Sequence, residues 1–277
     1  MWILSISIST QNNKSVLIMP LMQKEIFVSL KTIVTKEVKR FMRIWVQTLI
    51  PPAVTMVLYF IIFGNLVGNR IGEMQGITYI TFIVPGLIMM SVITNAYSNV
   101  VSSFFSNKFQ HSIEELLVSP TPNWVILLGF VLGGALRGLA VGTIVTVLSL
   151  FFTELQLHHL AVTIAILTLT AILFAIAGFI NAIYAKSFDD ITVIPNFVLT
   201  PLTYLGGVFY SIELLPEFWR YLSMLNPILY MVNTFRYGLI GFSDINVHVA
   251  LGVITLFVIF LFSFALYLLN KGIGIKQ

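Results

Sequence analysis

The residues of this sequence that are able to do chemistry are few and scattered. Arg137 is the only charged residue in the apolar stretch 124–152. An arginine at the centre of a membrane-spanning helix costs about 2.5–3.5 kcal/mol, so its guanidinium needs a polar partner or a wet cavity. Two roles remain open for it. One is contact with an anionic substrate group such as a lipid or glycan phosphate, and the other is a structural contact with a polar group on a neighbouring helix.

The other candidate groups lie in short connections. His158 and His159 have only Glu154 near them in the sequence, and Asp189 and Asp190 are adjacent. Adjacent carboxylates point in different directions on a helix, so we expect this pair to cap the next helix rather than bind a metal. These residues predict neither a hydrolytic cluster nor a metal site.

Several chemistries for energy coupling are missing from the sequence. There is no G-x-x-x-x-G-K-[ST] motif, so the chain has no P-loop for ATP. Ion-driven transporters usually carry carboxylates inside their membrane spans, and no apolar segment here contains one. The chain has no cysteine, which excludes disulfides and thiolate metal sites. If this chain is part of a pump, its energy comes from another polypeptide.

The elements that position these residues are apolar segments long enough to cross a bilayer. Of 277 residues, 58% are hydrophobic and 9% are charged, whereas a soluble domain has about 25% charged residues. We therefore predict an all-α membrane protein with six transmembrane helices. The expected spans are 45–64, 77–103, 124–152, 160–184, 191–210 and 247–269.

The lysines and arginines predict the orientation of these spans. Six spans place both termini on one side, and eleven of the fifteen basic residues fall on that side. The opposite side has three, namely Arg70, Arg220 and Arg236. Because cytoplasmic loops carry the excess of basic residues, we expect both termini in the cytoplasm. The basic residues lie beside apolar spans, so we read them as an orientation signal and not as a nucleic-acid-binding surface.

The N-terminal region divides into two parts. Residues 1–21 form a tail without the features of a signal peptide, and Met19 or Met22 is an alternative start. Residues 22–44 have apolar side chains on one side and five basic ones on the other. This pattern predicts an amphipathic helix in the membrane interface, next to anionic lipid. A helix packed on a soluble partner is the alternative.

Two further segments are neither ordinary spans nor ordinary loops. In the loop 104–123, Ser112 precedes two glutamates and an apolar pair, which predicts a short helix over 112–118. This helix is either a docking element for a soluble partner or a plain connector. The stretch 211–246 is apolar, broken by prolines and also charged. Short helices dipping into one face of the bilayer explain this combination.

Five segments together resemble the membrane subunit of ABC-2 type exporters. They are KEVKRFMRIWVQTLIPP (36–52), FIVPGLIMMSVITNAYSNV (82–100), FQHSIEELLVSP (109–120), FDDITVIPNFVLTPLTYLGGVFY (188–210) and NPILYMVNTFRYGLIG (226–241). The resemblance covers nearly all of the chain after residue 22. It implies an ABC-2 transmembrane domain over 45–274, with 22–44 as a connecting helix and 211–241 as external re-entrant helices.

The resemblance also implies partners and functional residues. A permease homodimer in the bacterial inner membrane would bind two ATPase subunits, and those subunits would hold ATP and Mg²⁺. The segment 109–119 would be the coupling helix, with contacts from Ile113, Glu114, Glu115, Leu116 and Leu117. The family signature would comprise Asn226, Pro227, Tyr230, Arg236, Tyr237 and Gly238.

The sequence therefore predicts a non-catalytic permease subunit that forms the substrate pathway of an ATP-driven exporter. Two alternatives belong to other classes: a secondary transporter and a membrane-bound enzyme that processes lipids. The missing intramembrane carboxylates argue against the first, and the missing catalytic cluster argues against the second.

Overall fold

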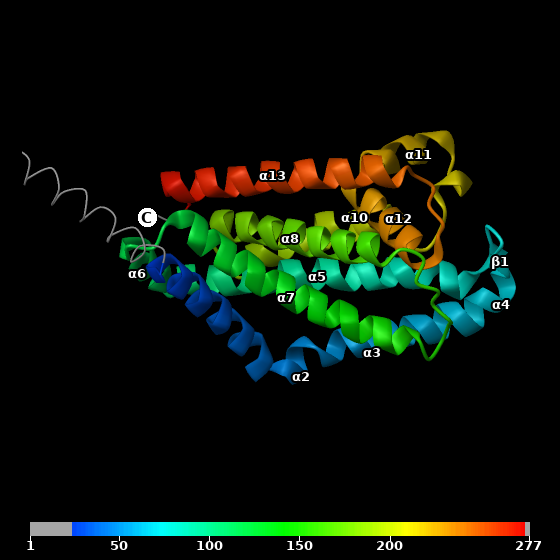
Figure 1. Ribbon diagram of the computed structural model, residues 1–277, viewed down its shortest axis with the longest axis horizontal. Coiled ribbons are helices and arrows are strands. Elements are labelled where there is room, and N and C mark those ends of the chain that lie inside the picture. The colour runs from blue at the N-terminus through cyan, green and yellow to red at the C-terminus, as the bar shows by residue number, and fades with distance from the viewer. Residues whose placement is uncertain (1–23, 275–277) are drawn as a thin grey trace, which may run out of the picture.

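The computed structural model describes residues 24–274, which fold almost entirely into helices (Figure 1). The expected tail 1–21 lies outside the described residues. Within them, five helical segments are long and apolar enough to cross a membrane. They are the run Trp45–Ile71, α5 (Tyr79–Phe109), α7 (Asn123–Ser149), α8 (Leu160–Tyr184) and α13 (Val247–Lys271). The predicted helical membrane architecture is confirmed at this level.

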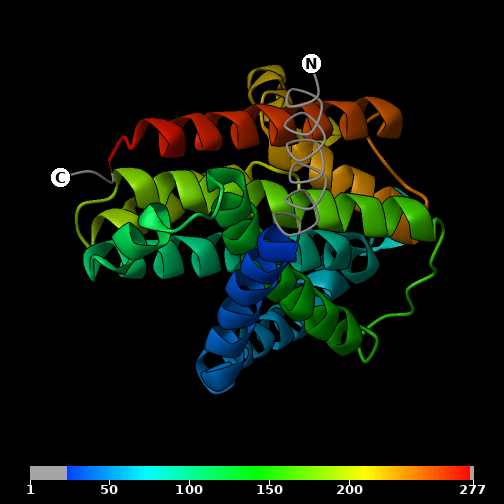
Figure 2. The same ribbon diagram turned by 60° about the vertical axis from the view of Figure 1, so that its left-hand side comes forward.

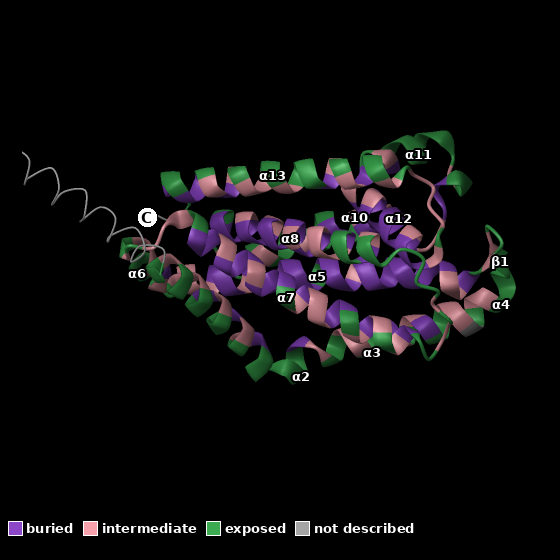
Figure 3. Cartoon of the chain, in the orientation of Figure 1, coloured by how far each residue is buried: buried purple, intermediate pink, exposed green. Residues whose placement is uncertain are grey.

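Helix α5 is the centre of the bundle, and α7 and α8 pack along it. Figure 3 shows α5 buried along most of its length, whereas α13 exposes its outer face. Glycines on α7 permit the close packing. A Cβ atom added at Gly138 would lie only 2.9 Å from the Cβ of Ala96 on α5. The absence of a side chain at Gly138 therefore lets α5 approach α7 closely.

The N-terminal helix occupies 24–43 of the described chain and crosses the bundle beside α7 (Figure 2). Its buried face contains Ile33, Glu37 and Phe41. A Cβ at Gly129 of α7 would collide with Ile33 and one at Gly133 with Glu37, so these two glycines let the N-terminal helix approach α7 closely. Phe27, expected on the apolar face, is 65% exposed.

The run after the N-terminal helix changes its winding along its length. It comprises α2 (Trp45–Thr48), α3 (Ile50–Tyr59), the π-helix η1 (Phe60–Val67) and α4 (Gly68–Ile71), and it extends seven residues beyond the expected end at Gly64. A two-residue hairpin follows, with β1 (Glu73–Met74) antiparallel to β2 (Ile77–Thr78). Gln75 and Gly76 form its turn with positive φ angles of 56° and 74°.

The expected fifth span is shorter than the sequence predicts. It consists of α9 (Asp190–Ile194), the π-helix η2 (Pro195–Leu199) and α10 (Thr200–Tyr204). Fifteen helical residues rise about 22 Å, whereas the hydrocarbon core is about 30 Å thick. The helix ends before two glycines, and Gly207 has a positive φ of 69° that other residues rarely adopt.

The broken stretch forms short helices at one end of the bundle. The 3₁₀ turn η3 (Ile212–Leu214) leads to α11 (Glu217–Met224) and α12 (Pro227–Ile240). Helix α12 packs against α5, α8 and α13, whereas α11 lies on the outside (Figure 1). The short helix α6 (Ser112–Val118) lies at the opposite end, together with the end of α13. We call these two ends the α11 end and the α6 end.

Candidate functional site

Helix α5 carries four polar side chains at four-residue intervals. They are Asn95, Asn99, Ser103 and Asn107. Residues four apart lie on the same face of a helix, so these side chains form one row, which we call the α5 ladder. The ladder runs from the middle of α5 toward the α6 end, and each member bonds to a charged side chain from another helix.

Two arginines reach the ladder from different helices. Arg137 of α7 donates from Nη2 to the Oδ1 atom of Asn95 at 3.2 Å. Arg40 of the N-terminal helix donates to both the backbone oxygen and Oδ1 of Asn99, at 2.8 and 2.9 Å. The bond to Asn95 is the polar contact with a neighbouring helix that was one of the two roles expected for Arg137. The structure therefore gives Arg137 a structural partner and leaves the role in substrate contact as a proposal.

Glu37 is the acidic partner of the ladder, and its side chain is fully buried. The hydroxyl of Ser103 donates to its Oε1 atom at 2.7 Å, and Arg40 Nε lies 3.4 Å from its Oε2 atom. Glu37 was not among the residues predicted from the sequence. A signal was present, because Ile33, Glu37 and Phe41 are four residues apart and therefore share one helix face.

Asn107 joins three helices at the α6 end of the ladder. Lys36 of the N-terminal helix donates to Asn107 Oδ1 at 3.0 Å. Ser112, the first residue of α6, donates from its hydroxyl to the backbone oxygen and Oδ1 of Asn107, at 3.2 and 3.1 Å. Asn107 therefore links α6 to α5 and to the N-terminal helix.

The surface of α6 differs from the expected one in one respect. Ile113, predicted to contact the ATPase, is only 1% exposed and packs into the core of its own chain, so it is not available to a partner. Leu116 and Leu117 are partly buried against the same core. The exposed residues are Glu114, Glu115 and also Val118, whose side chain is 88% exposed.

Arg236 was predicted as one of three basic residues in loops on the external side, and the structure places it elsewhere. Its side chain is fully buried, not in an aqueous loop. Its guanidinium lies 3.8 Å from the centre of the Phe82 ring and donates to the backbone oxygens of Phe82 and Gly207, at 3.2 and 2.7 Å. Arg236 thus ties α12 to α5 and to the turn after α10.

The remaining signature residues hold α12 in place. Asn226 caps the helix by accepting from the N–H of Ile228, and Pro227 occupies the first turn. The hydroxyl of Tyr230 donates to the backbone oxygen of Met224 at 2.9 Å. The ring of Tyr237 meets that of His158 edge-on, and Gly238 packs closely against Thr163 of α8. In this structure these contacts are all within the chain.

The short connections have structural partners as well. Asp190 accepts hydrogen bonds from the N–H groups of Lys186 and Ser187, which lower the pKa of its carboxyl below the usual range. It therefore closes the turn before α9. The prediction that Asp189 and Asp190 cap that helix is wrong, because neither side chain makes a capping hydrogen bond to it. Across residues 24–274, no cluster of three His, Cys, Asp or Glu side chains is arranged for a metal.

Comparison with known proteins identifies the family. The family model described as ABC-2 type transporter matches residues 28–240. The chain belongs to the ABC-2 type transporter family. It is 58% identical over 251 residues to the inner membrane transport permease YadH of Escherichia coli K12, covering 91% of this chain and 98% of YadH. It is 22% identical over 216 residues to nodulation protein J of Rhizobium leguminosarum bv. viciae, covering 78% and 83% of the two chains.

This ABC-2 protein is thus a membrane transport permease. The matched region contains the α5 ladder, α6 and α12, so all three belong to the ABC-2 part of the chain. Arg137 was found from sequence because its charge interrupts an apolar run. The Asn and Ser residues of the ladder are uncharged, so only their four-residue spacing could have indicated the row.

Proposed function

We propose that this chain is the transmembrane permease subunit of an ATP-driven exporter in the bacterial inner membrane. Its membership of the ABC-2 family and its similarity to YadH support transport across that membrane. The chain has no P-loop, so a separate ATPase subunit binds ATP and Mg²⁺ and supplies the energy. The observation that carries the proposal is the construction of α6, a short helix fixed to the bundle on one side and exposed on the other.

Helix α6 is suited to receive force from a partner. Ile113 anchors it in the core, and Ser112 connects it to the α5 ladder through Asn107. Its outward side offers two carboxylates and one apolar side chain. A groove with an apolar floor and a basic rim on the ATPase would fit this surface. Closure of the ATPase subunits on ATP then pushes α6, and the ladder carries the displacement to the middle of the membrane.

The proposed topology has six spans with both termini in the cytoplasm. The run 190–204 is the fifth and shortest of these spans. Helices α11 and α12 follow it as re-entrant helices on the external side. Lys24, Lys108, Lys186 and Lys271 lie near the α6 end, whereas Arg70 and Arg220 lie near the α11 end. The excess of lysine and arginine at the α6 end supports a cytoplasmic location for that end.

The proposed assembly is a permease homodimer with two ATPase subunits. The resemblance to ABC-2 exporters supports this stoichiometry. Two faces of the single chain are available for membrane lipid or for a second copy, because α11 exposes Phe218 and Tyr221 and the run 190–204 exposes Phe197. Alternating movement of the two copies would open the pathway to one side and then to the other.

Docking through α6 is testable by co-purification of the ATPase with the permease. We expect the double variant Glu114→Lys with Val118→Asp to lose the ATPase, because it reverses one charge and removes the exposed apolar contact. Loss of a buried valine contact alone corresponds to about tenfold weaker binding. These side chains are exposed, so the variant should fold normally. Leu116→Asp with Leu117→Asp should also uncouple, but it perturbs packing inside the chain.

Glu217→Lys is the matched control, since Glu217 is an exposed glutamate on α11 at the other end of the bundle. This control should retain the ATPase. Equal recovery of the ATPase with the wild type and with the α6 variant would show that α6 is only a connector.

A further inference from the structure

The place where Arg40 and Arg137 approach the α5 ladder has more hydrogen-bond donors than acceptors. The Nε atom of Arg137 and the Nδ2 atom of Asn99 are buried, and neither has a hydrogen-bond acceptor among the described residues. The side chain of Asn99 is fully buried. Burying a donor without an acceptor is costly, so such groups mark a position where an acceptor is to be expected.

The charges at this place are also not balanced. Glu37 pairs with Arg40. Arg137 makes its one hydrogen bond to a neutral amide, and no carboxylate within residues 24–274 forms an ion pair with it. Residues 1–23 contain no acidic side chain that could supply one. Arg40 and Arg137, which bond to side chains one helical turn apart on α5, are thus compensated by one carboxylate.

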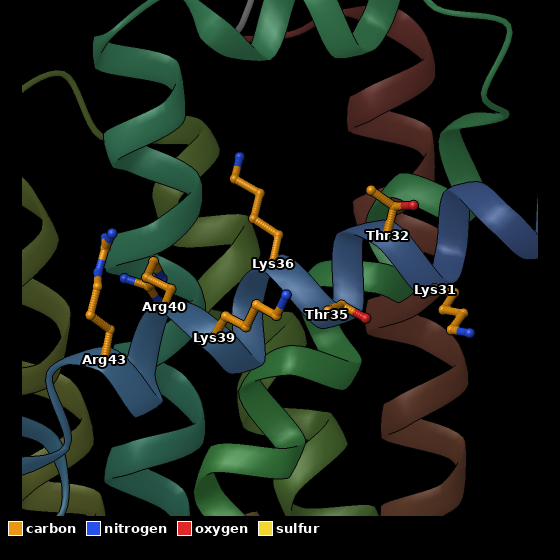
Figure 4. A pocket seen from close by; sticks show the side chains of 7 residues that line it. All are labelled: Lys31, Thr32, Thr35, Lys36, Lys39, Arg40 and Arg43. Carbon is orange, nitrogen blue, oxygen red and sulfur yellow. The ribbon is translucent and has the colours of Figure 1, made fainter.

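A basic groove leads to this place along the N-terminal helix. It has a volume of about 890 Å³, and its lining contains two threonines and the basic residues Lys31, Lys36, Lys39, Arg40 and Arg43, with no acidic residue. Figure 4 shows Arg40 and Arg43 beside each other at one end of this row and Lys31 at the other. Arg40 lines the groove and also bonds to Asn99, so it is the residue that connects the groove with the ladder.

We propose that Arg137, Asn99 and Arg40 form a binding site for the anionic phosphate group of a lipid headgroup. Phosphate oxygens supply the missing acceptors, and the negative charge compensates Arg137. Guanidinium groups are well matched to phosphate because they donate two parallel hydrogen bonds. The headgroup enters along the basic groove while its acyl chains remain in the leaflet at the α6 end.

This inference rests on the proposed function only for the assignment of the α6 end to the inner leaflet. Binding of a lipid to the permease needs no ATPase. The site is therefore testable on the purified permease alone, and its failure would leave ATPase docking at α6 unaffected.

Native mass spectrometry of the full-length permease with added lipid tests the site. We expect phosphatidylglycerol to bind at least tenfold more tightly than phosphatidylcholine with the same acyl chains. Arg137→Gln should weaken phosphatidylglycerol binding by about tenfold, the effect of losing one charge-assisted hydrogen bond. Arg137→Lys keeps the charge and should retain part of the preference, which separates loss of the site from loss of folding.

Lys271→Gln and Arg70→Gln are the matched controls, since Lys271 is an exposed residue at the end of α13 near the α6 end, Arg70 lies on α4 near the α11 end, and neither lines the groove. Each should change binding by less than about threefold. Equal losses in Lys271→Gln and Arg137→Gln would indicate general surface attraction and overturn the site. Equal binding of the two lipids, or unchanged binding in Arg137→Gln, would also overturn it and would leave water as the partner of the unpaired donors.

Inorganic phosphate in the same samples distinguishes two sources of the phosphate group. Retention of phosphatidylglycerol at millimolar phosphate would support a lipid headgroup as the ligand. Displacement at that concentration would support the same site chemistry with free phosphate as the ligand.

Discussion

Adding one methyl group at Gly138 should separate α7 from α5. The new Cβ would lie 2.9 Å from the Cβ of Ala96 and 3.0 Å from the backbone oxygen of Val92. The second of these atoms belongs to the backbone of α5, which is unable to move without its helix. We therefore expect α7 to shift outward, which would lengthen the 3.2 Å bond between Arg137 and Asn95.

The expected change in the free energy of unfolding of Gly138→Ala follows from a comparison with Gly252→Ala on α13. Alanine is favoured over glycine inside a helix by about 1 kcal/mol, and this gain is common to both positions. No atom lies within 4 Å of a Cβ at Gly252, so Gly252→Ala should stabilise the protein by about that amount. At Gly138, overpacking costs about 1–3 kcal/mol in addition. The free energies of unfolding of the two variants should therefore differ by about 1–3 kcal/mol.

Unfolding of both variants in mixed micelles with increasing dodecyl sulfate, followed by tryptophan fluorescence, measures this difference. Arg137→Gln in each background tests the consequence for the ladder. The cost of Arg137→Gln should be smaller in Gly138→Ala than in Gly252→Ala, because the bond to Asn95 is already weakened there. Equal stability of the two glycine variants would refute the close packing of α5 and α7.

Two further predictions concern the α11 end. Arg236→Met should lower the free energy of unfolding by about 2–5 kcal/mol, because it removes the Arg236 donor from the buried backbone oxygen of Gly207 and also removes the contacts with Phe82. Arg220→Met, at an exposed position of α11, should change it by less than about 0.5 kcal/mol in the same unfolding assay; similar losses in both would contradict the anchoring role of Arg236. Reporter domains fused at Gln277 and inserted after Asp244 should give opposite signals for cytoplasmic and external location, and matching signals would refute the proposed topology.

The long helices were predictable because apolar length determines them directly. The bounds Leu160–Tyr184 of α8 coincide with the expected span. The run 190–204 was harder to predict, since hydropathy continues through Gly206 and Gly207 although the helix ends at Tyr204. A sequence-based estimate of span length registers apolar residues and does not detect where the backbone turns.

Arg137 and Arg236 show which parts of the candidate site were predictable from the sequence. Arg137 was identified because it interrupts an apolar run, whereas Arg236 stands in a charged stretch and looked like a residue of an external loop. Its burial depends on the backbone oxygens of Phe82 and Gly207, which come together only in the folded chain. The same is true of Ile113, whose place in the core depends on how α6 lies against the bundle.

The central claim is that a separate ATPase drives this permease through α6. The most direct measurement is the rate of ATP hydrolysis by the partner ATPase reconstituted in lipid nanodiscs with the permease. The rate should rise with the wild-type permease and with Glu217→Lys, and it should stay at the level of the ATPase alone with Glu114→Lys and Val118→Asp combined. Equal stimulation by the wild type and the α6 variant, with both correctly folded, would contradict the claim.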